Sequence, residues 1–189
     1  MVGFGRKQAW LAVRGDDPSA VISALGLRDL GPVPWREAVD VAHLTDDRLA
    51  VTPPLPGARD ARWVLVAGRR LFTMSLVDVV ALSATLATEV QLFATHRVTE
   101  FHRWQRAVDG VVVRAFGYLG ESGDVTEWRG DPDAAELSLG LPVDPDDADG
   151  DVLVGETDVA RLAEAWSVDP TVLDGQPATA RPHVAADPA

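Results

Sequence analysis

The chain has 189 residues, 47% of them apolar and 24% charged, which is the length and composition of one globular domain. It contains no cysteine, which excludes disulfides, zinc–thiolate sites, iron–sulfur clusters and a cysteine nucleophile. No stretch approaches the roughly 18 apolar residues of a membrane span, and the first residues lack the apolar segment of a secretory signal. We therefore expect a cytoplasmic protein without a membrane partner, and the excess of Arg over Lys is typical of a GC-rich bacterial genome.

The net charge of −12 is unevenly distributed along the chain. Residues 1–120 carry 14 basic and 12 acidic side chains, a balance of +2, whereas residues 121–189 carry 3 basic and 17 acidic side chains, a balance of −14. An acidic chain is poorly suited to the phosphates of nucleic acids, so we expect no nucleic-acid partner. The acidic part favours contact with a basic protein, although most acidic surfaces serve solubility alone.

The predicted elements begin with a strand at 8–13 and a helix. Asp17 is suited to cap this helix, Pro18 to occupy its first position and Gly26 to end it. Residues 35–43 are compatible with either a short helix or a strand. Further strands are predicted at 49–52, 62–67, 91–98, 100–107, 111–119 and 125–129, and the first two of these are expected to pair as a hairpin.

Three more helices are predicted. The one at 75–89 has Ser75 as its cap, Asp78 at its third position and apolar residues around much of its circumference, which predicts a buried helix. A short helix is expected between the Asp131-Pro132 pair and Gly140, and an amphipathic helix at 156–167. The segment between these last two is an acidic loop.

These elements predict an α+β fold, with a mostly antiparallel sheet of hairpins, a few helices on one face of the sheet, and an acidic helical C-terminal segment. We expect a single domain at 1–174, composed of a neutral core at 1–120 and an acidic part at 121–174. Residues 175–189 have almost no large apolar side chain, and we expect them to be a disordered tail.

Two histidines and one carboxylate form the first candidate site. His96, Glu100 and His102 fall around a predicted turn between two strands, and two histidines with a carboxylate can bind a metal ion. Side chains alternate between the two faces of a strand, so the two histidines need not point to the same side. The alternative is a pair of half-exposed histidines. There is no G-x-S-x-G motif and no phosphate-binding glycine loop, and we expect no cofactor and no catalytic residue.

The acidic loop is the second candidate site. Aligned on Gly150, residues 145–156 follow the spacing of a calcium-binding loop at several positions, but the first ligand position is Pro145, which has no side-chain oxygen. Whether the loop binds a metal stays open, and the alternative is an acidic surface loop. Its aspartates are candidates for contact with a basic partner: Asp144, Asp146, Asp147, Asp149 and Asp151.

The chain has six tryptophans and one tyrosine. Trp10 and Trp63 lie in strongly predicted strands and are expected in the core. Trp104 and Trp128 have arginine neighbours and are expected to be half-exposed. Because Trp and Arg are frequent at binding hot spots, both are candidate partner-binding residues, with sheet-covering aromatics as the alternative.

Two stretches of the chain are similar to known sequences. Val51 to Leu55 followed by Trp63 to Gly68, and Trp166 to Pro170, resemble segments of uncharacterised proteins from GC-rich bacteria, some of them assigned as immunity proteins of polymorphic toxins. The resemblance implies a small cytosolic binding protein and assigns no functional residue.

The sequence thus leads to three hypotheses. The first is a non-enzymatic protein-binding module, an immunity-type inhibitor that covers a basic partner with its acidic part. The second is a metal-dependent enzyme that uses the histidine–glutamate cluster. The third is a structural subunit of a larger assembly that uses exposed tryptophans for contact.

Overall fold

The computed structural model describes residues 1–145 and 154–188. Its centre is an antiparallel sheet in the order β2-β10-β3-β5-β1-β6-β7-β8-β9, with β4 paired to β5. The strands are β1 (Ala9–Arg14), β2 (Arg28–Pro32), β3 (Arg48–Val51), β4 (Leu55–Pro56), β5 (Arg62–Ala67), β6 (Glu89–His96), β7 (Phe101–Val108), β8 (Val111–Leu119), β9 (Asp124–Arg129) and β10 (His183–Ala186). The predicted α+β class and antiparallel sheet are confirmed.

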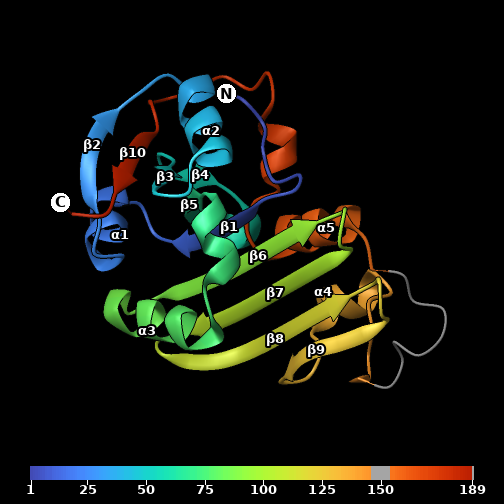
Figure 1. Ribbon diagram of the computed structural model, residues 1–189. Coiled ribbons are helices and arrows are strands. Elements are labelled where there is room, and N and C mark those ends of the chain that lie inside the picture. The colour runs from blue at the N-terminus through green and yellow to red at the C-terminus, as the bar shows by residue number, and fades with distance from the viewer. Residues whose placement is uncertain (146–153, 189) are drawn as a thin grey trace.

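The helices lie in the connections between strands (Figure 1). They are α1 (Pro18–Ala24), α2 (Trp35–Leu44), α3 (Leu76–Leu86), α4 (Ala134–Ser138) and α5 (Glu156–Trp166), with short 3-10 turns η1 (Ala58–Asp60), η2 (Arg69–Thr73) and η4 (Pro170–Leu173). Asp17 and Ser75 cap α1 and α3 as predicted, and the ambiguous segment at 35–43 is a helix. The cap of α4 is Asp133, two residues after the predicted start.

Helices cover both faces of the sheet, so the expectation of helices on one face was wrong. The tryptophan face, which carries Trp10, Trp63 and Trp104, packs against α2 and α5. The aliphatic face, with Leu11, Val64 and Leu92, packs against α1 and α3. Strands in the middle of such a sheet are buried on both sides, which is why β1 and β5 are apolar at nearly every position.

The C-terminal residues also differ from expectation. The disordered tail predicted for 175–189 instead contains β10, which lies between β2 and β3 in the sheet. Val184 pairs with Ala50, and Ala185 is fully buried on the aliphatic face. This segment forms a strand although its apolar side chains are small, because the neighbouring strands β2 and β3 satisfy its backbone hydrogen bonds on both sides.

Four consecutive strands, β6 to β9, form a meander at one end of the sheet (Figure 1). The Asp109-Gly110 turn between β7 and β8 has both residues at positive φ, as a tight two-residue hairpin turn requires. Among the described strands, β9 pairs only with β8 and is therefore an edge of the sheet. His96, Glu100, His102, Trp104 and Trp128 all lie on this meander.

Candidate functional site

The predicted histidine cluster does not assemble. Along the β6–β7 hairpin, His96 is opposite Phe101 and Thr95 is opposite His102, so alternation places the two histidines on opposite faces of the sheet. His96 contacts the ring of Phe72, with the ring centroids 6.0 Å apart. Among residues 1–145 and 154–188 there is no group of three His, Asp or Glu side chains that could hold a metal ion. The candidate metal triad is therefore not formed, and of the two histidines in the alternative only His96 is half-exposed.

His102 is instead a buried residue of the tryptophan face. It is 3% exposed, and its Nδ1 lies 3.0 Å from the hydroxyl of Thr95. Burial lowers the pKa of His102 below its ordinary value, and the nearby charge of Asp158 opposes this shift without cancelling it. The imidazole is therefore a neutral, structural group.

Trp104 is also buried, which corrects its assignment as a surface contact. Its side chain is fully buried against the ring of Phe116, and its indole nitrogen donates to Glu136 Oε1 over 2.9 Å. Glu136 in turn accepts from Arg114 Nε over 2.8 Å, and both of these charged side chains are at most 1% exposed. This pair fixes α4 to the sheet, and a buried Trp104 cannot contact a partner. Trp10 and Trp63 are in the core, as predicted.

Trp128 on β9 is half-buried, as expected. The guanidinium carbon of Arg114 lies 4.1 Å from its ring centroid, and the edge of its ring faces Phe116. One part of the ring therefore belongs to the packing of the meander, and the remainder reaches the surface. Its role as a partner-binding residue stays a prediction.

Most of the acidic loop lies outside the described residues. Asp144 is exposed, whereas Asp146, Asp147, Asp149 and Asp151 belong to the segment 146–153. The calcium-loop spacing at 145–156 falls largely on the same segment. Both predictions therefore stay as they were made.

A buried ionic cluster joins η1, β6, β7 and α4. The carboxylate of Glu89 accepts from Arg59 over 2.9 Å and from Arg106 over 2.7 Å, and Arg106 also pairs with Asp133. Burial by itself raises the pKa of Glu89, but hydrogen bonds from Arg59 and Gln91 and the two arginine charges hold the pKa below its ordinary value. No sequence pattern marks this cluster, because its members lie far apart along the chain.

A polar groove runs along β8 on the aliphatic face of the meander, beyond the part of that face that α3 covers. Two rows of side chains cross it. In the first row, Gly117 on β8 is paired with Arg103 on β7 and with Glu127 on β9. In the second row, Ala115 on β8 is paired with Gln105 on β7 and with Arg129 on β9. The small residues of β8 leave room between them for long polar side chains from β7 and β9, which line the hollow. We call this site the β8 groove; its volume is about 500 Å³, and its lining also includes Ser75, Leu76, Phe101, Thr126 and Trp128.

A β-bulge shapes one wall of the β8 groove. Gly117 pairs with Glu127 and Tyr118 with Val125, which leaves Thr126 as the extra residue on β9. A Cβ atom on Gly117 would lie 2.6 Å from the hydroxyl of Thr126, so this position requires glycine. Bulges of this kind redirect side chains and are frequent beside binding sites.

Two polar atoms of the β8 groove lack hydrogen-bond partners. The amide nitrogen of Gln105 donates to Glu127 Oε2 over 2.6 Å, but Gln105 Oε1 has no partner although the residue is only 1% exposed. Because a carboxylate only accepts, the amide nitrogen must face Glu127, which leaves the oxygen as the unsatisfied atom. Arg103 Nε is likewise buried and unpaired, while Nη2 of the same side chain donates to the carbonyl of Phe72 over 3.3 Å.

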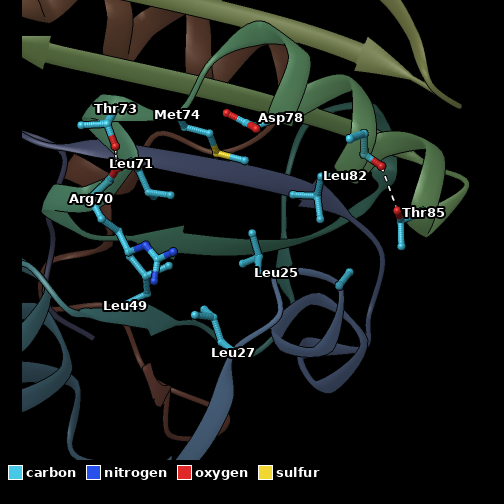
Figure 2. Close-up of a pocket in the computed structure, with 12 residues that line it drawn as sticks. Leu25, Leu27, Leu49, Arg70, Leu71, Thr73, Met74, Asp78, Leu82 and Thr85 are labelled. Carbon is cyan, nitrogen blue, oxygen red and sulfur yellow. Dashed lines mark hydrogen bonds between the residues drawn. The ribbon is translucent and has the colours of Figure 1, made fainter. Parts of the chain in front are cut away.

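A second hollow lies between α1, α3 and η2 and has a volume of about 400 Å³. Figure 2 shows leucine side chains from several elements pointing into it, with the charged groups of Arg70 and Asp78 at its margin. Both charges already have partners, because Arg70 pairs with Asp187 over 2.6 Å and Asp78 accepts from the backbone of Ser75. The hollow therefore presents no unsatisfied polar group that selects a ligand, unlike the β8 groove.

No family model, no curated protein and no solved structure matches this chain. Within the described part of the chain, the helices are too short or too polar to cross a membrane.

Proposed function

We propose that this chain is a non-enzymatic, cytoplasmic protein-binding module, an immunity-type inhibitor that covers a basic partner. The observation that carries the proposal is the charge distribution: residues 121–189 have a balance of −14, against +2 for residues 1–120. A surface of one sign accelerates the encounter with a partner of the opposite sign and suppresses contact with other acidic proteins. The lack of cysteine supports a reducing compartment.

The acidic part also supplies the edge strand of the meander. Among the described strands β9 has a single neighbour, and an edge strand can pair with an extended segment of another protein. β9 carries Asp124 and Glu127, and Asp131 and Asp133 follow it directly. A basic segment that adds to this edge would therefore meet carboxylates along its length, with the exposed part of Trp128 beside it.

The aspartates of the acidic loop are assigned to steering. In the proposal Asp144, Asp146, Asp147, Asp149 and Asp151 attract the partner at long range, and the contact itself forms with β9 and its surroundings. Charges at this distance act on the association rate more than on the dissociation rate, and added salt weakens the effect over a Debye length of about 8 Å at 0.15 M.

Affinity capture with the full chain, followed by identification of the bound protein, tests the proposal. The captured protein is then measured by stopped-flow association against the chain and against a variant in which the five loop aspartates are changed to Asn. We expect a partner with a basic surface, and an association rate that falls in this variant and with added salt.

A matched variant controls for net charge. It neutralises five acidic residues in the first 120 residues: Asp16, Glu37, Asp40, Asp47 and Asp109, all of which are exposed. This variant has the same net charge as the loop variant and should retain most of the association rate. A partner with an acidic surface, or equal rates for the two variants, would contradict the proposal.

A further inference from the structure

We propose that the β8 groove binds a free α-amino acid with an apolar side chain. This site is separate from the acidic loop and does not depend on the proposed function. The inference starts from the two buried polar atoms without partners, the carbonyl oxygen of Gln105 and the Nε of Arg103. One requires a donor and the other requires an acceptor, and they project from positions i and i+2 of one strand face, roughly 7 Å apart.

Unsatisfied buried polar atoms are unfavourable for the folded chain. A buried group without its hydrogen bond reduces stability by about 1 to 3 kcal/mol. Leucine at position 105 would fill a similar volume without this penalty. The retention of an amide beside an incompletely paired guanidinium is explained if a ligand supplies the missing partners.

The charges of the β8 groove specify a zwitterion. Arg103 and Arg129 present positive charge, and Glu127 presents negative charge next to the free oxygen of Gln105. An α-carboxylate would accept from Arg103 Nε and pair with Arg129. An α-ammonium group would donate to Gln105 Oε1 and to Glu127. A simple anion would meet the carboxylate of Glu127, and a simple cation would meet two arginines, so a ligand with one charge is disfavoured.

The dimensions and the remaining lining residues fit a small ligand with an apolar side chain. β7 and β9 flank β8, and strands lie about 4.8 Å apart, so the backbones of β7 and β9 are separated by roughly 10 Å, and Gln105 and Glu127 meet across this span. Leu76 and Phe101 line the groove and are each half-buried, which provides apolar surface at its margin. Arg129 is exposed, so its side chain can move aside when a ligand enters.

The test is a titration of the ¹⁵N-labelled full chain with L-phenylalanine, followed by NMR and by calorimetry. We expect chemical-shift changes at residues of β7, β8 and β9, including the side-chain amide of Gln105. Two analogues separate the charges: phenylalaninamide lacks the carboxylate and 3-phenylpropionate lacks the ammonium group. Each analogue should bind at least about tenfold more weakly, because each loses charge-assisted hydrogen bonds.

Variants assign the binding to the β8 groove. Gln105→Leu should remove the binding of L-phenylalanine without lowering the melting temperature, because it removes an unsatisfied polar atom. Glu127→Gln, at a half-buried position, should weaken binding about tenfold. Glu121→Gln makes the same charge change in an exposed turn and should leave binding unaltered.

The proposal is overturned by any of three results. The first is that millimolar L-phenylalanine causes no shift changes in the β8 groove. The second is that the two analogues bind as tightly as L-phenylalanine. The third is that Glu127→Gln binds like Glu121→Gln, and this comparison holds even if Gln105→Leu fails to fold. Capture of a basic partner is unaffected by these results, so the two proposals fail separately.

Discussion

Loss of the negative charge of Glu136 should destabilise the fold strongly. Glu136 and Arg114 are both at most 1% exposed and pair over 2.8 Å, so Glu136→Gln leaves a guanidinium uncompensated in the core. Removal of one partner of a buried pair reduces stability by about 3 to 5 kcal/mol, a large fraction of the roughly 5 to 15 kcal/mol that stabilises a typical domain. With an m-value of about 2 kcal/mol/M in urea, the midpoint should fall by roughly 2 M.

Urea unfolding followed by circular dichroism measures this effect, with the exposed Glu164→Gln on α5 as the matched charge control. The double variant Glu136→Gln with Arg114→Met retains an acceptor for the indole of Trp104 and removes the unpaired charge. It should therefore be more stable than Glu136→Gln alone. A loss of less than about 1 kcal/mol in Glu136→Gln, or simple additivity in the double variant, would refute this account of how α4 is held.

Four further predictions concern stability. Burial lowers the pKa of His102, so the unfolded chain takes up a proton near pH 6.5 that the folded chain does not. The free energy of unfolding should therefore fall as the pH drops from 7.5 to 5.5, and it should fall less in His102→Asn. Urea midpoints measured at the two pH values check this. The pKa of Glu89 is also lowered, so the contribution of its carboxylate to stability is present above about pH 4.5 and is lost as the pH falls below that value. A urea midpoint of the wild-type chain that drops no more steeply in this range than that of Glu89→Gln would contradict this. Deletion of 182–189 removes β10 from the middle of one side of the sheet and should lower the melting temperature by more than 10 °C, whereas a truly disordered tail would give no change. Gly130→Ala should destabilise the β9–α4 connection, because φ is +68° and a Cβ atom would collide with the carbonyl oxygen of Val113; an unchanged melting temperature would exclude that clash.

The sequence was sufficient for the class of fold and for the meander. Alternating apolar residues and the Asp109-Gly110 turn predict β7 and β8 to within a residue or two, because a tight hairpin depends on local chemistry alone. The caps Asp17 and Ser75 likewise act within one helical turn. Local patterns therefore identify elements that neighbouring residues stabilise.

The errors arose where distant segments meet. β10 pairs with β2 and β3, which are more than 130 residues earlier in the chain, and its short sequence His-Val-Ala-Ala has no local strand signal. Helices on both faces could have been anticipated, because Trp10 to Val13 is apolar at both strand parities. A strand that is apolar at both parities indicates burial on both faces.

The sites illustrate the same limit. Trp104 and its arginine neighbours suggested an exposed contact, but a glutamate 32 residues away supplies the hydrogen bond that permits full burial of the indole. The β8 groove depends on the register of three strands and on the bulge at Thr126, which places Arg103 and Glu127 on either side of Gly117. Register of this kind follows from packing of the whole sheet and is not readable from one strand.

The central claim is that the acidic C-terminal part is the surface that meets a partner. Hydrogen–deuterium exchange of the full chain, alone and with the captured basic partner, tests this claim most directly. The account predicts slower exchange in residues 121–174, including β9, and little change in β2 and α2 at the opposite end of the sheet. Protection confined to β2, β10 and α2, with no change in residues 121–174, would contradict it.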